Sequence, residues 1–297
     1  MISKKQGYIY LFLTFVLWGS LYVVSKYTLG KLPPFTISFV RFVIAFLTLC
    51  VLQGKTKKKM DRRDYKYVLL IGGAGYFIAV GAQLLGTKYA GASIASLINS
   101  LNPVTMTLFA MFLLGEAVTF GKIAGIFLAL SGVYVILGSG GEGAGMNGIL
   151  LSLFSVVLWS VVSVMSRKVT QNYEPLQITR NSAGVAAMLY LPVCLWEVQA
   201  EGGLHPDFSC VAALAYMGIL CTGLAYLLWN KSLSVLEAGT CSAFYPIQPL
   251  VSAGLGIIFL GEKIRMTFWT GAVLIVAGVL VNLLSGSRKK AVEDYTP

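Results

Sequence analysis

Ten apolar stretches of about 20 residues each follow one another along this chain, separated by short segments with charged or turn-forming residues. They fall at about 7–25, 34–53, 67–86, 92–115, 120–138, 147–166, 175–196, 211–229, 238–261 and 266–285. A helix that crosses a bilayer needs about 20 mostly apolar residues, so ten such helices would use about 200 residues of the chain. We therefore predict an all-α integral membrane protein with ten transmembrane helices and little room for a soluble domain.

The composition excludes an ordinary soluble domain. Only 12% of the residues are charged, whereas about a quarter are charged in a typical soluble protein. The formal net charge is +11, but the basic residues flank the apolar stretches, as they do in membrane proteins, so no nucleic-acid partner is expected. The cysteines have no C-x-x-C spacing and indicate neither disulfides nor a metal site; they are Cys50, Cys194, Cys210, Cys221 and Cys241.

The distribution of lysine and arginine predicts the orientation. With a cytoplasmic N-terminus, the inner segments hold 16 of these residues and the outer segments hold five. Cytoplasmic segments carry the basic excess in membrane proteins, and an even number of helices returns the chain to its starting side. We expect a multi-pass protein of the plasma (inner) membrane, in contact with lipids, with both termini cytoplasmic and the acidic loop from Glu197 to Asp207 outside.

The two halves of the chain are related by an internal repeat. Residues 92–140 align without a gap with residues 238–286, and 14 of the 49 pairs are identical at this offset of 146. Earlier in each half, Trp18 matches Trp159 at an offset of 141. We therefore expect two domains of five helices each, at 7–138 and 147–285. Because five is odd, the two domains must enter the membrane from opposite sides, which is the inverted-repeat design of secondary transporters.

The order and duplication of these matches resemble the drug/metabolite transporter superfamily, specifically its ten-helix members with two EamA repeats. The residues that carry the resemblance are Trp18-Gly19, Pro34 with Arg41, Asn102-Pro103, Leu114-Gly115-Glu116, Gly125, Gly132 and their counterparts in the second half. The resemblance implies a basket in which helices 1–4 and 6–9 enclose a cavity, with helices 5 and 10 at the periphery. It also implies alternating access for small metabolites, often in export.

Polar residues near the middle of two predicted helices are candidates for the wall of that cavity. Asn99 and Asn102 in the first half correspond to Tyr245 and Gln248 in the second half. Asn102 and Gln248 lie about ten residues into their helices, or ~15 Å deep at ~1.5 Å per residue, close to the middle of the hydrocarbon layer. We expect these side chains to face substrate, although polar residues at this depth also cross-link helices in bundles.

Aromatic and glycine residues complete the set of candidates. The aromatic candidates and one amide residue either line the cavity, where aromatic rings stack on substrate groups, or pack between helices and lipid. They are Trp18, Trp159, Tyr76, Tyr226 and Gln83. The glycines of the two predicted peripheral helices indicate close helix packing; they are Gly125, Gly132, Gly271 and Gly278.

Charged residues inside the predicted spans are scarce. By depth alone, Arg41 is placed to pair with Glu262 and Arg180 with Glu116, so that each pair ties or gates the two repeats. The alternatives are that both arginines extend to the membrane surface and that each glutamate ends its helix in solvent. No carboxylate or histidine is expected at the middle of the membrane, so proton coupling has no obvious carrier.

These features predict a secondary transporter, a permease or exporter of small neutral, zwitterionic or amphipathic metabolites such as amino acids. No Walker A, H-E-x-x-H or G-x-S-x-G sequence is present, so we expect no enzyme activity, cofactor or metal. The alternative is a membrane-embedded enzyme that acts on a lipid-soluble substrate. The protein is expected to be a monomer or a weak homodimer.

Overall fold

The structure is a computed structural model that describes residues 3–53, 60–114, 119–138, 145–204, 206–236, 241–242, 244–262 and 266–293. Across these ranges all regular structure is helical, which confirms the all-α prediction. Six helical stretches are long and apolar enough to cross a bilayer; they are Lys4–Leu29, Pro34–Leu52, Arg62–Ala90, Met146–Thr170, Pro175–Ala200 and Phe208–Leu233. The remaining apolar stretches form shorter helices within the described ranges, so the number ten stays a prediction.

The helices follow the predicted stretches closely in both halves. The first half contains α1 (Lys4–Leu29), α2 (Pro34–Leu52), η1 (Arg62–Asp64), α3 (Tyr65–Leu70), η2 (Ile71–Ala79), α4 (Val80–Ala90), α5 (Ala92–Asn99), α6 (Asn102–Leu114) and α7 (Phe120–Gly138). The second half contains α8 (Met146–Thr170), α9 (Pro175–Ala200), α10 (Phe208–Tyr216), η3 (Met217–Leu224), α11 (Ala225–Leu233), α13 (Ile247–Leu260) and α14 (Met266–Glu293).

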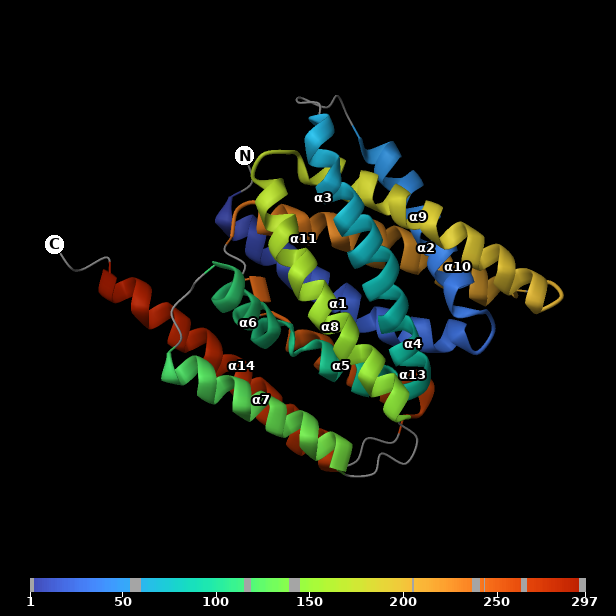
Figure 1. Ribbon diagram of the computed structural model, residues 1–297. Coiled ribbons are helices and arrows are strands. Elements are labelled where there is room, and N and C mark those ends of the chain that lie inside the picture. Colours follow the sequence, from blue (N-terminus) through green and yellow to red (C-terminus); the bar gives the residue numbers. More distant parts are fainter. Residues whose placement is uncertain are drawn as a thin grey trace.

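Helices from the two halves pack against one another throughout the bundle. Helix α1 contacts α11 and α13, α2 contacts α9 and η3, and α4 contacts α8. Helices α7 and α14 lie side by side along one edge of the molecule (Figure 1). The two largest clusters of buried apolar residues in the described chain therefore draw on both halves.

The α7–α14 pair is held by the predicted glycines. A Cβ atom added at Gly278 would lie 2.5 Å from the Ala129 nitrogen and 2.6 Å from the Gly125 carbonyl oxygen. One added at Gly132 would lie 2.7 Å from the Gly271 carbonyl oxygen. These are distances to backbone atoms, which cannot turn aside as a flexible side chain can. The glycines thus allow two helix backbones to approach closely, as small residues do in membrane bundles.

We expect Gly278→Ala to lower the thermal stability of the protein, by about 1–3 kcal/mol, because the added methyl group forces the two backbones apart. The control is Gly254→Ala in α13, where an added Cβ meets no atom within 4 Å. Alanine there should be neutral or stabilise by up to about 1 kcal/mol through helix propensity. Thermal unfolding in detergent measures both variants, and equal melting temperatures would contradict the packing role.

Two pairs of irregular segments occupy matching positions in the two halves. The π-helices η2 and η3 begin at Ile71 and Met217, which have the same 146-residue offset as the sequence repeat. Helix α5 ends at Asn99 and α6 begins at Asn102, while in the second half a turn at residues 244–246 precedes α13. Pro103 needs no helical N–H so close to the start of α6, and the single helix predicted over 92–115 is therefore broken there. Discontinuous helices and π-bulges both mark functional regions in many membrane proteins.

Outside the bundle, one surface ion pair ties the α1–α2 connection to the start of α10. Lys31 Nζ lies 2.5 Å from an Asp207 carboxylate oxygen. The hydrogen bond from Lys31 lowers the pKa of the Asp207 carboxyl to about 2, with a further contribution from the Cys210 backbone N–H. Because its carboxylate accepts from the Cys210 N–H, Asp207 also acts as the N-cap of α10.

Candidate functional site

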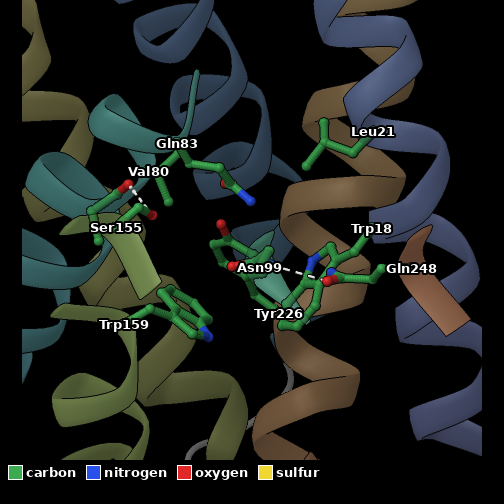
Figure 2. Close-up of a pocket in the computed structure, with 10 residues that line it drawn as sticks. Trp18, Leu21, Val80, Gln83, Asn99, Ser155, Trp159, Tyr226 and Gln248 are labelled. Carbon is green, nitrogen blue, oxygen red and sulfur yellow. Dashed lines mark hydrogen bonds between the residues drawn. The ribbon is translucent and has the colours of Figure 1, made fainter. Parts of the chain in front are cut away.

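A small cavity lies between the two halves at the level of the irregular segments. Its walls come from both repeats (Figure 2); the lining residues are Trp18, Leu21, Ala79, Val80, Gln83, Asn99, Ser155, Trp159, Tyr226 and Gln248. The cavity volume is about 20 Å³, which is room for one or two water molecules. This space is too small for a metabolite, which can therefore enter only if the surrounding helices or side chains move apart.

The amide pair in this cavity is Asn99 with Gln248. Asn99 Nδ2 donates to Gln248 Oε1 over 3.0 Å, which joins the end of α5 to the first turn of α13 (Figure 2). Asn102, expected to face substrate, is 0% exposed and does not line the cavity. Its Nδ2 donates to the Asn99 backbone oxygen at 2.7 Å and Oδ1 at 2.8 Å, and its own Oδ1 accepts from Ser160. Asn102 therefore holds Asn99 in place from outside the cavity. The helix break between α5 and α6 turns Asn102 away from the helix face that carries Asn99.

Two tryptophans and a tyrosine form the aromatic wall. Trp18 and Trp159 meet edge to face with ring centroids 5.8 Å apart, and Tyr226 lies 5.5 and 5.6 Å from them. Trp18 Nε1 donates to the Cys221 carbonyl oxygen in η3. Such rings present apolar faces with fixed orientation to the cavity.

Tyr245 and Tyr76 support this wall from outside the cavity. Trp159 Nε1 donates to the Tyr245 hydroxyl over 2.9 Å, and the Tyr76 ring packs 4.7 Å from Tyr226. Both tyrosines were expected in the cavity wall, but neither lines it because a tryptophan or a second tyrosine stands between. The Tyr245 hydroxyl fixes the position of Trp159, and the Tyr76 ring fixes that of Tyr226.

Four lining residues were not anticipated from the sequence: Leu21, Ala79, Val80 and Ser155. Ser155 donates to the Ala79 carbonyl oxygen, close to the end of the π-helix η2. Val80 and Tyr226 are 146 residues apart and both line the cavity, so extending the repeat alignment to earlier residues would have indicated Val80. Gln83, which was anticipated, donates to the Tyr22 hydroxyl.

The structure does not form the predicted pair of Arg41 with Glu262. Arg41 is 1% exposed, so it does not extend to the membrane surface either, and its Nε donates to Thr222 Oγ1 over 3.0 Å. The Glu262 carboxylate instead accepts from the Ala92 and Ser93 backbone N–H groups and the Ser93 hydroxyl. It caps the N-terminus of α5, where free N–H groups and the helix dipole attract a negative charge.

The second predicted pair, Arg180 with Glu116, cannot be compared because Glu116 lies outside the described residues. Arg180 is half-buried in α9 and donates twice to Asn181 Oδ1, at 3.0 and 2.7 Å. Glu197, expected in an acidic loop, belongs to α9 and is 7% exposed. Its carboxylate accepts from the Phe35 and Thr36 backbone N–H groups and caps α2.

Several long apolar helices around a small polar and aromatic cavity, shared by two halves of one chain, define a multi-pass membrane transporter. The sequence model of the EamA-like transporter family matches residues 5–138 and again residues 146–284. The chain belongs to this family. It is a transporter and not an enzyme, so the alternative of a membrane-embedded enzyme is excluded.

Curated relatives agree with this assignment, and a solved structure shares the fold. A protein of Archaeoglobus fulgidus described as an uncharacterized transporter is 28% identical over 93% of this chain and 98% of its own length. A probable amino-acid metabolite efflux pump of Salmonella typhimurium is 26% identical over 95% of this chain and 96% of its own. One crystal structure matches with a TM-score of 0.71 at 24% identity, covering 96% of this chain and 99% of that one, and supports the fold.

Proposed function

We propose that this protein is a secondary transporter that moves small neutral, zwitterionic or amphipathic metabolites, such as amino acids, across the plasma (inner) membrane by alternating access. The observation that carries the proposal is the cavity, whose Asn99–Gln248 bond and tryptophan pair each join one repeat to the other. A site built jointly by two repeats changes its exposure when one repeat rocks against the other. The name of the Salmonella relative supports amino-acid metabolites and the export direction.

The architecture that we propose has ten spans in two inverted repeats, at 7–138 and 147–285, with both termini cytoplasmic. The common 146-residue offset of η2 and η3 supports this arrangement, as do the helix breaks before α6 and before α13. The oligomeric state that we propose is a monomer or a weak homodimer. The described residues that line the cavity include no Asp, Glu or His, so we expect facilitated diffusion or exchange rather than proton coupling.

Counterflow in proteoliposomes tests this function. Liposomes that contain the purified protein and an unlabelled amino acid should accumulate the labelled amino acid transiently, with saturation at high concentration. A panel of labelled amino acids and amphipathic metabolites identifies the substrate. If no compound shows saturable counterflow, or if an imposed proton gradient alone drives uptake with matching proton movement, the proposed function or its coupling is wrong.

The orientation is tested by cysteine labelling in a background without the native cysteines. Arg63→Cys, in the basic segment before α3, should react with an impermeant reagent only after the membrane is opened. Glu201→Cys, at the end of α9, should react from outside in intact cells. Both positions are exposed at the surface, so access to the thiol depends only on the side of the membrane. Equal labelling of both from outside would contradict the proposed topology.

A further inference from the structure

A second, smaller cavity adjoins the first and contains a buried guanidinium group. Its lining residues are Leu21, Tyr22, Ser25, Arg41, Gln83, Leu84 and Thr87. Leu21 and Gln83 belong to both cavities and stand between them. The Gln83 amide, which donates to the Tyr22 hydroxyl, therefore separates the amides and tryptophans of the first cavity from Arg41 in the second.

The Arg41 guanidinium is only partly satisfied by the protein. Its Nε donates to Thr222 Oγ1, but Nη2, which carries two of the five N–H donors, is buried and has no hydrogen-bond partner among the described residues. Burying an unpaired cation is costly, and a buried polar group without a partner is rare in folded proteins. The arrangement is understandable if a ligand supplies the missing acceptor.

No carboxylate in the described part of the chain balances this charge. The only ion pair there joins Lys31 to Asp207. Glu197 is buried and Glu262 is partly buried, but both carboxylates accept hydrogen bonds from helix N-termini. Arg41 thus remains a cation inside the bundle whose counter-ion is not a described side chain.

We propose that Arg41 binds the carboxylate of the transported metabolite, while the body of that metabolite occupies the neighbouring cavity between Trp18, Trp159 and Tyr226. This inference rests on the proposed transport function and narrows its substrate class to organic carboxylates, zwitterionic amino acids included. A planar guanidinium matches a carboxylate with two parallel N–H to oxygen bonds. Arg41 is the only cation that lines either cavity within the described residues, so a doubly charged phosphate would stay half neutralised.

The pairing requires Gln83 and Leu21 to move, because the second cavity encloses only about 10 Å³. Such movement is expected of a transporter that closes around its substrate. Gln83 can then turn from Tyr22 to the ligand, and the Tyr22 hydroxyl becomes available to the bound carboxylate. Because Arg41 and Tyr22 lie on one side and the aromatic rings on the other, the site is selective for ligands that present a carboxylate at one end.

The test compares acids with the corresponding amides, which lack the carboxylate, on the purified full-length protein. The probes are 3-phenylpropionate and 3-phenylpropanamide, L-leucine and L-leucinamide, and inorganic phosphate, with binding measured by thermal shift and transport by inhibition of counterflow. In the wild type, the acids should bind about tenfold or more tightly than their amides, and more tightly than phosphate. Arg41→Gln should abolish this preference and leave the weak binding of the amides unchanged.

Two further variants keep the result interpretable. Arg180→Gln removes a half-buried arginine whose side chain, within the described part of the protein, donates to Asn181. This variant should retain the preference for acids. Arg41→Lys preserves the charge if Arg41→Gln fails to fold, and it should weaken acid binding because lysine lacks the planar fork. Equal binding of acids and amides by the wild type, tighter binding of phosphate, or undiminished acid binding by Arg41→Lys or Arg41→Gln would overturn the inference. Transport that persists in any of these cases would leave the proposed function intact.

Discussion

Gln248→Leu is expected to weaken substrate binding about fivefold or more while the protein still folds. Leucine keeps a similar volume but removes the acceptor for Asn99 Nδ2 and every hydrogen bond that the amide offers to the cavity. One well-made hydrogen bond to a ligand in a dry site is worth ~1 kcal/mol or more, which corresponds to this loss in affinity. The half-saturation concentration in counterflow and the dissociation constant measure the effect.

Asn102→Leu is the matched comparison, since it removes the equivalent amide of the other repeat. Because Asn102 contacts Asn99 and Ser160 and does not line the cavity, the cost should fall on stability, at about 1–2 kcal/mol for this cluster of buried bonds. Affinity in the folded fraction should change less than in Gln248→Leu. A large loss of affinity in Asn102→Leu with an unchanged melting temperature would show that the two amides have equivalent roles.

Glu262→Ala is expected to lower the free energy of unfolding by about 2–3 kcal/mol. Glu262 is the residue of the second repeat that caps α5 of the first, so its loss leaves the Ala92 and Ser93 N–H groups without an acceptor and removes a charge from a helix N-terminus. Gly261 makes this contact possible, because its φ of 62° turns the chain back at the end of α13. Thermal unfolding in detergent measures the loss.

Glu201→Ala serves as the control for this prediction. Glu201 follows α9, is exposed, and contributes no side-chain hydrogen bond to a described residue, so its removal should change the melting temperature little. Glu262→Gln should fall between the two, because an amide oxygen still accepts a hydrogen bond but carries no charge. If Glu262→Ala is as stable as Glu201→Ala, the cap does not tie the repeats together.

The sequence indicated the composition of the site better than its geometry. Trp18, Gln83, Asn99, Trp159, Tyr226 and Gln248 were all candidates and all line the cavity. The repeat alignment paired Asn102 with Gln248, whereas the bond across the cavity joins Asn99 to Gln248. An alignment assumes equal helix geometry in both halves. The helix break between α5 and α6 instead rotates Asn102 and the residues after it around the helix axis. Whether these residues bind substrate is what the variants above will decide.

The amino-acid sequence by itself determined that the chain is helical, apolar and duplicated, because the length of the apolar stretches and the repeated Pro and Gly positions are local properties that no folding partner can alter. Only the tertiary structure decided where the charges go. Arg41 and Glu262 have compatible depths along their helices, yet one lies beside a cavity and the other caps α5. Depth follows from position in the sequence, but the partner of a buried charge depends on how the helices rotate and pack, and on which free N–H groups they bring within reach.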